Sequence, residues 1–190
     1  MRFTVEQYHR MIESGIVPED HRYELIHGYI LPKDRSHAGD DPMTVGRLHR
    51  IALDRLMALR TMLDGKHAHL SVQQPVAFPD HSEPEPDAAI VRGQAEDYDP
   101  HPTADHVLCV IEVSDSSLHH DRVTKAGLYA SAGIKQYVIV NLVDGVVEVR
   151  TQPSPSERRY DAVAVLRGGQ SLALQLPQGM LKVAVADLLP

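Results

Sequence analysis

The chain has 190 residues, of which 43% are hydrophobic and 24% charged, which excludes a protein that is disordered throughout. No apolar run approaches the roughly 20 residues that span a bilayer, and the N-terminus lacks an apolar signal core, so we expect a cytoplasmic protein. The net charge of −7 is not that of a protein held on DNA by a broad basic surface. A nuclease stays possible, because bound cations and a local basic patch can hold phosphates.

The N-terminal part begins with a helical pattern. Thr4 and Gln7 have the spacing of a capping box, and apolar residues then recur on one helical face until Gly15 ends the segment. Residues 23–32 (YELIHGYILP) predict two short strands around His27-Gly28. The first segment is therefore expected to be a helix followed by a hairpin.

The middle of the chain alternates between loops, a helix and strands. Residues 35–42 are polar and predict a loop, and the apolar spacing over residues 45–63 predicts one long helix. Residues 69–78 are strand-like, residues 79–86 form a proline-rich break, and residues 87–91 predict a short strand.

The most apolar strand covers residues 107–113 (VLCVIEV) and contains Cys109, the only cysteine, which we expect to be a buried reduced thiol. A helix over residues 121–132 and a second covered strand over residues 136–141 follow. A strand, a helix and a strand in succession predict a parallel pair with a right-handed crossover.

Three further strands, joined by turns, are expected to be antiparallel: residues 146–151, 160–166 and 171–176. Together these elements predict an α/β protein with a mixed sheet flanked by helices. We expect residues 1–190 to form one domain.

Glu112 is the exception in its apolar strand. An ionised carboxylate there costs several kcal/mol unless it is paired, and it lies near the end of the strand where open α/β sheets place ligands. A residue facing water or a structural ion pair would also explain it. Asp87 begins the preceding short strand, although a Pro-Asp pair is common in turns.

Two more residues complete a candidate set. Lys125 lies on the following helix and either turns toward Glu112 or forms a surface pair with Asp121. Glu24 lies in the first short strand, where a solvent-facing position is the default interpretation. Two carboxylates on adjacent strands suit Mg²⁺, and a nearby ammonium can position a water and stabilise a transition state.

The sequence resembles the Uma2 family of restriction-endonuclease-like proteins within the PD-(D/E)xK nuclease superfamily. The resemblance rests chiefly on the fourth of the following segments: RYELIHGYI (22–30), PMTVGRLH (42–49), EPDAAIV (85–91), VIEVSDSSLHHDRVTKAGLYASAGIKQYVIVN (110–141) and VEVR (147–150).

The resemblance implies a restriction-endonuclease-like core with Asp87 and Glu112 as metal ligands, Lys125 as the catalytic lysine and Glu24 as a supporting acid. The superfamily pattern places its lysine two residues after the acid, where this chain has Ser114. The sequence resembles the branch in which the lysine comes from the next helix.

Other candidates are weaker. His49, Asp121 and Tyr129 are possible supporting residues around the site, and Arg122 is either a phosphate contact or a solvated charge. The closest histidine groups, at residues 67–69 and 119–120, lack a zinc-binding motif.

The leading hypothesis is a Mg²⁺- or Mn²⁺-dependent endonuclease that hydrolyses DNA. Asp87, Glu112 and the backbone carbonyl of Val113 would hold the metal, Lys125 would act at the attacking water, and Glu24 would assist. The alternatives are a non-catalytic binding protein with a nuclease fold and a different metal-assisted hydrolase. A homodimer is also expected, because cutting both strands needs two sites.

Overall fold

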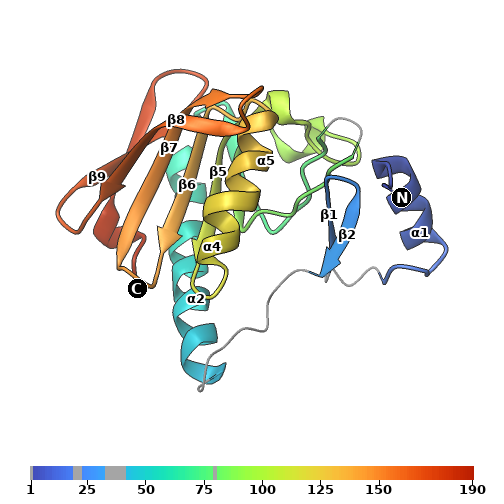
Figure 1. Ribbon diagram of the computed structural model, residues 1–190. Coiled ribbons are helices and arrows are strands. Elements are labelled where there is room, and N and C mark those ends of the chain that lie inside the picture. Colours follow the sequence, from blue (N-terminus) through green and yellow to red (C-terminus); the bar gives the residue numbers. More distant parts are fainter. Residues whose placement is uncertain (1, 19–22, 33–41, 79–80) are drawn as a thin grey trace.

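A six-stranded mixed sheet forms the centre of the protein (Figure 1). The computed structural model describes residues 2–18, 23–32, 42–78 and 81–190. The strand order is β3-β4-β5-β6-β7-β8; β5 and β6 are parallel and the other neighbours antiparallel. The strands are β3 (Ala68–Val72), β4 (Ala88–Arg92), β5 (Val107–Ser114), β6 (Gln136–Asn141), β7 (Val146–Ser154) and β8 (Arg159–Leu166).

Both faces of the sheet are covered, and side chains of β5 alternate between the two layers. Ile111 and Val113 pack into the core cluster that includes the helices α2 (Pro42–Met57) and α3 (Leu59–Leu63). The hairpin of β9 (Ser171–Gln175) and β10 (Met180–Ala184) packs into the same cluster. Val110 and Glu112 therefore point to the opposite face.

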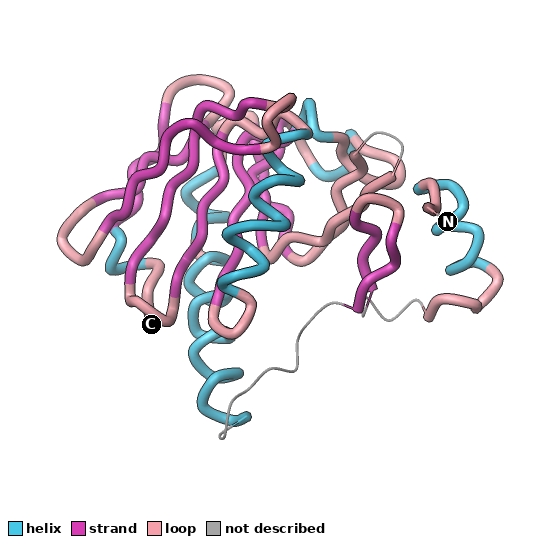
Figure 2. Tube along the Cα trace, in the orientation of Figure 1, coloured by secondary structure: helices cyan, strands magenta, loops and turns pink. Residues whose placement is uncertain are grey.

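That opposite face carries the connection between β5 and β6. It consists of α4 (Leu118–His120), a π-helical turn (Asp121–Lys125) and α5 (Ala126–Ser131), which run on from one another. Figure 2 shows these segments as one continuous helical path beside the sheet. A π-helical turn inside a helix is rare and frequently occurs at functional sites.

The N-terminal segment adds a small layer beside this helix. It contains α1 (Val5–Glu13) and the antiparallel strands β1 (Tyr23–Ile26) and β2 (Tyr29–Pro32). Leu25 exchanges backbone hydrogen bonds with Glu83, at 3.3 and 2.7 Å between N and O. This pairing fixes β1 next to the segment that leads into Asp87 and β4.

Short 3-10 turns complete the chain: Ala95–Asp97, Ala104–His106 and Val185–Asp187. Within the described ranges, no helix combines the length and the apolar character needed to cross a membrane.

The fold class is confirmed as a mixed sheet flanked by helices. The Thr4–Gln7 capping box is present, with Gln7 N donating to Thr4 Oγ1 at 3.1 Å, and the β1–β2 hairpin turns at His27-Gly28. The parallel pairing of β5 with β6 and the antiparallel pairing of β7 with β8 are also as predicted, whereas the third predicted strand, β9, pairs with β10 in a separate two-stranded sheet.

Several boundaries were wrong. The helix predicted over residues 45–63 begins at Pro42 and is interrupted at Ala58, because Leu59 starts a new helical segment. The strand predicted over residues 69–78 ends at Val72, where Gln73 adopts a positive φ of 50°. Residues 35–41 of the loop predicted over residues 35–42 lie outside the described residues, and Pro42 belongs to α2.

Two further differences concern the second half of the chain. The helix predicted to begin at Asp121 begins at Leu118 and passes through the π-helical turn. Strand β10 was not predicted, although the turn residues Pro177 and Gly179 lie directly before it and separate it from β9.

Candidate active site

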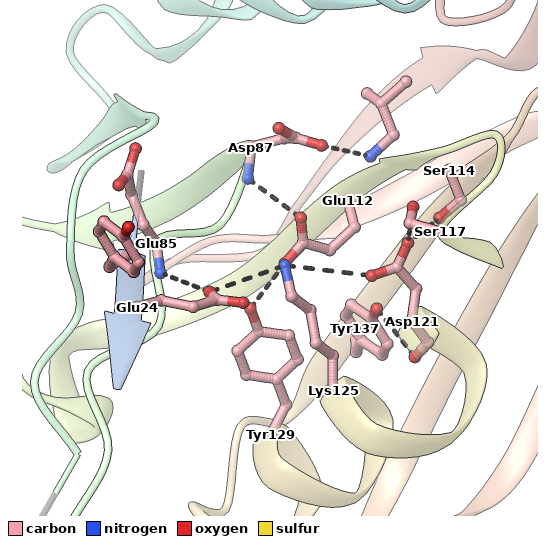
Figure 3. A network of polar contacts seen from close by, with 12 residues as sticks. Glu24, Glu85, Asp87, Glu112, Ser114, Ser117, Asp121, Lys125, Tyr129 and Tyr137 are labelled. Atoms are coloured by element: carbon pink, nitrogen blue, oxygen red, sulfur yellow. Dashed lines mark hydrogen bonds and ion pairs between the residues drawn. The ribbon is translucent and has the colours of Figure 1, made fainter. Parts of the chain in front are cut away.

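Glu112 is held by three donors in the buried layer between β5 and the helix (Figure 3). Its side chain lies on the face opposite Val113 and is only 2% exposed. Oε1 accepts hydrogen bonds from Lys125 Nζ at 2.9 Å and from Tyr129 Oη at 2.7 Å. Oε2 accepts one from the backbone N–H of Asp87 at 3.2 Å. The apolar strand therefore buries a carboxylate that has partners on both oxygens.

Asp87 lies directly before β4 and is tied to β5 by its side chain. Its Oδ2 accepts a hydrogen bond from the backbone N–H of Val113 at 2.9 Å, and His49 Nε2 lies 3.4 Å from the same oxygen. Asp87 and Glu112 are thus cross-linked through each other's strand backbone. The structure brings together the two carboxylates that the sequence singled out.

Lys125 turns inward from the π-helical turn. Besides its 2.9 Å contact with Glu112, its Nζ lies 4.0 Å from Glu24 Oε2 and 4.0 Å from Asp121 Oδ1. The alternative of a surface pair between Asp121 and Lys125 was wrong, because both side chains are buried. The ammonium of Lys125 therefore lies within 4.0 Å of three carboxylates.

Glu24 reaches this group from β1. The default expectation of a solvent-facing residue was wrong: Glu24 is 4% exposed, and its Oε2 accepts from the backbone N–H of Glu85 at 3.4 Å. The physical reason is that β1 is covered by the segment around Glu83, with which it exchanges backbone hydrogen bonds.

Asp121 anchors the start of the π-helical turn. Its Oδ2 accepts hydrogen bonds from the hydroxyls of Ser114 and Ser117, both at 2.6 Å, and its backbone carbonyl accepts one from Tyr137 Oη at 3.1 Å. The two serines were not predicted as residues of the site. Ser114 could have been found, since it occupies the position of the superfamily's lysine.

The charges of the site are strongly coupled. Burial, together with the charge of Asp87, raises the pKa of Glu112 to about 7 despite the opposing charge of Lys125. Burial also acts to raise the pKa of Asp87, but the His49 contact, the charge of Lys125 and the Val113 N–H outweigh it and lower that pKa to about 2. The two environments thus move apart the pKa values of Asp87 and Glu112, whose intrinsic acidities are similar.

The cation and the phenol respond to the same surroundings. Burial opposes protonation of Lys125, but Glu112, Glu24 and Asp121 raise its pKa well above the usual value, so it stays an ammonium. Burial and the neighbouring Glu112 raise the pKa of Tyr129 well above its usual range. Tyr129 is therefore a neutral donor to Glu112, in addition to its packing in the core.

Arg122 does not join this group. Its guanidinium pairs with Glu148 of β7 and, at 3.3 Å, with Asp144. Of the histidines considered for zinc, His69 contacts the Gly93 carbonyl through Nδ1 at 3.0 Å.

The donor set suits a hard cation such as Mg²⁺, which is typically bound by one or two carboxylates and several waters. The side-chain contacts of Asp87 with the Val113 N–H and with His49 both use Oδ2. Within those same residues, no three His, Cys, Asp or Glu side chains are grouped to hold a metal. The residues therefore fit a two-carboxylate site completed by backbone, substrate or water oxygens.

Comparisons with known proteins identify the family and the fold of the chain. The model of the Uma2 family, described as "Putative restriction endonuclease", matches residues 5–186. A crystal structure from Anabaena variabilis, described as "a putative nuclease belonging to DUF820", covers 98% of this chain and 97% of that chain. Its TM-score is 0.67 at 16% sequence identity, so the likeness shows the shared fold. A search among proteins with curated functions found no match.

Proposed function

The chain belongs to the Uma2 family of nucleases, and from this premise we propose that it is a Mg²⁺- or Mn²⁺-dependent endonuclease that hydrolyses phosphodiester bonds of DNA. The observation that carries the proposal is the inward turn of Lys125, whose Nζ lies 2.9 Å from Glu112 Oε1. The superfamily's lysine is absent from the strand, and the ammonium from the next helix reaches the carboxylate in its place. We also propose that residues 1–190 form a single nuclease domain.

The metal would be held by Asp87, Glu112 and the backbone carbonyl of Val113. When bound, it would neutralise charge on the phosphate and acidify a water. Asp87 would bind the metal without first losing a proton, because its low pKa keeps it ionised at neutral pH. Glu112 must be ionised to bind, so metal binding near pH 7 would displace a proton from it.

Lys125 would act at the attacking water. Its three carboxylate neighbours keep it protonated, so it serves as a hydrogen-bond donor and electrostatic stabiliser and not as a general base. Glu24 would orient solvent or assist the metal from the other side of Nζ. Tyr129, His49 and Asp121 would hold Glu112, Asp87 and Lys125 in place.

The test is cleavage of supercoiled, linear double-stranded and single-stranded DNA, and of RNA, with Mg²⁺ or Mn²⁺. Lys125→Ala should lower the rate by about 100-fold or more, as loss of one electrostatic stabiliser does. Lys135→Ala is the matched control, since Lys135 is an exposed lysine beyond the same helix. Equal rates for wild type and Lys125→Ala on every substrate would disprove the catalytic assignment.

Calorimetry with Mn²⁺ separates the enzyme from a non-catalytic binding protein. Metal uptake that Asp87→Asn abolishes supports the enzyme, and tight DNA binding with no metal uptake supports the alternative. We further propose that the protein is a homodimer. A monomeric mass measured by light scattering would disprove this.

A further inference from the structure

A cleft of about 690 Å³ lies between the β1–β2 hairpin and helix α5, apart from the carboxylates described above. Its inner wall is apolar and includes Ile26, Phe78 and Leu128, all of which are buried. Its lining also contains four basic residues from four distant parts of the chain: Arg2, His27, His81 and Arg158. Asp105 is the one acidic residue among the lining residues that the structure describes. An apolar wall with a basic rim is therefore built into a protein whose net charge is −7.

Hydrogen bonds bring the basic residues together. Phe3 N donates to the Gly28 carbonyl at 2.9 Å, and Gly28 N donates to the His81 carbonyl at 2.6 Å. A Cβ at Gly28 would lie 2.7 Å from Arg2 Cβ, so only glycine allows this approach. The N-terminal segment, the hairpin turn and the segment at His81 are thus joined at one edge of the cleft.

Arg158 reaches the same place from the β7–β8 turn. Its carbonyl packs against helix α5 at Gly127, where an added Cβ would lie 3.3 Å away. Its guanidinium contacts His27 Nε2, across 131 residues of sequence. Burial first, and then the charges of Arg158 and Arg2, lower the pKa of His27, so the ring is neutral at pH 7 and accepts this hydrogen bond.

The backbone at this contact is unusual. His27 and Arg158 have φ values of 51° and 53°, in the left-handed region that glycine and asparagine adopt more readily. Non-glycine residues held in this region are concentrated at functional sites. Arginine at this turn position thus carries a conformational cost that asparagine or glycine would lessen.

The positive charge at the rim has no carboxylate partner in the described parts of the chain. Neither Arg2 nor Arg158 forms an ion pair with any of those residues, whereas the next residue, Arg159, pairs with Asp161 at 3.2 Å. Two arginines beside an apolar wall can bind a phosphate, and bidentate contacts of arginine with phosphate are strong. Tyr29, which is 52% exposed, lines the same cleft and offers an aromatic face.

We propose that this cleft binds one nucleotide unit of the substrate strand, with its phosphate on Arg158 and Arg2 and its base against Tyr29 and the apolar wall. The proposal rests on the proposed nuclease function and extends it to substrate positioning. The cleft shares elements with the catalytic residues: Ile26 lies two residues after Glu24, roughly 7 Å along β1. The ring of Phe78 packs edge-on against Tyr129, with 5.9 Å between centroids. The cleft and the catalytic residues are therefore neighbours through β1 and through the contact of Phe78 with Tyr129.

The test measures binding in EDTA, so that it does not depend on metal or cleavage. The probe is a fluorescently labelled single-stranded DNA oligonucleotide, followed by anisotropy with the full-length chain. Arg158→Gln should weaken binding about tenfold and lower the salt dependence of log K by about 0.7. Arg159→Gln, which removes the same charge one residue away and outside the cleft, should change binding less than twofold.

A second variant separates binding from folding. Arg158→Asn should weaken binding as Arg158→Gln does while leaving the urea midpoint equal to or higher than that of wild type, because asparagine suits the left-handed conformation. A purely structural role for Arg158 would lower the midpoint. Equal oligonucleotide affinities for the Arg158 and Arg159 variants would overturn the proposal.

Competition experiments against the labelled oligonucleotide show whether the cleft also binds free nucleotides or only phosphate. Deoxyadenosine monophosphate that displaces the oligonucleotide from wild type, but less well from Arg158→Gln, assigns free nucleotides as ligands of the cleft too. Competition by inorganic phosphate alone, at the same concentrations, would overturn the role of the apolar wall. If no metal supports cleavage and Arg158→Gln still weakens binding, the catalytic proposal fails and this one stands.

Discussion

The ion pair between Lys125 and Glu112 should make stability depend on pH in a way that one substitution can expose. Lys125→Met removes the ammonium 2.9 Å from Glu112 and keeps most of the apolar side chain. In metal-free wild type, Glu112 has a pKa of about 7, against 4.5 for the free side chain. A carboxyl whose pKa is raised on folding binds more protons in the folded state, so its ionisation lowers stability as pH rises from about 4.5 to about 7.

The size of this effect follows from the pKa values. The difference between about 7 and 4.5 corresponds to roughly 3 kcal/mol at 1.36 kcal/mol per pKa unit. Above about pH 7, the Lys125→Met variant must either bury the Glu112 carboxylate without its ion-pair partner or keep it protonated. Removing one partner of a buried ion pair lowers stability by about 3–5 kcal/mol. At about pH 5.5, Glu112 is protonated in both proteins, and the loss should fall to about 1–3 kcal/mol, as for an unpaired buried polar group.

The assay is urea unfolding in EDTA at about pH 5.5 and about pH 8.5, on either side of the Glu112 pKa. The destabilisation by Lys125→Met should be at least about 1 kcal/mol larger at the higher pH. Lys135→Met, at an exposed lysine, is the control and should change stability by less than about 0.5 kcal/mol at both values. A loss for Lys125→Met that is the same at the two pH values would refute the coupling between these residues.

Two further predictions concern single groups in the core. Tyr129→Phe deletes the donor 2.7 Å from Glu112 and should lower the cleavage rate about tenfold and stability by about 1.5–3 kcal/mol, measured by kinetics and urea unfolding; an unchanged rate would remove Tyr129 from the site. Cys109 is fully buried, and burial raises the pKa of its thiol, so a thiol reagent should label it only after unfolding; labelling of the native protein at the rate of a free thiol would contradict its placement.

The local patterns of the sequence determined most of the secondary structure. The Thr4–Gln7 capping box, the His27-Gly28 turn and the two covered strands could be predicted because neighbouring residues along the chain decide them. The same patterns identified Glu112, since a carboxylate within an apolar strand is anomalous without any knowledge of its partners. Asp87 and Lys125 became candidates through their positions, at the start of the preceding short strand and on the following helix, and the family resemblance supplied the roles expected of them.

Tertiary packing decided what the local patterns left open. Whether Lys125 faced Glu112 or solvent depended on the π-helical turn, which Asp121 holds through its buried hydrogen bonds with Ser114 and Ser117. Glu24 is buried only because a distant segment covers β1. Such contacts join groups that are far apart in sequence, and no local periodicity encodes them.

The cleft beside α5 illustrates this most clearly. The sequence contains Arg158 in a turn and His27 in another, and each is unremarkable by itself. Packing of the β7–β8 turn on Gly127 brings them into contact across 131 residues. By itself the sequence determined the elements and the anomalous acid, because these depend on neighbours in the chain. Only the tertiary structure decided which charges meet, because burial and distance exist only once the chain has packed.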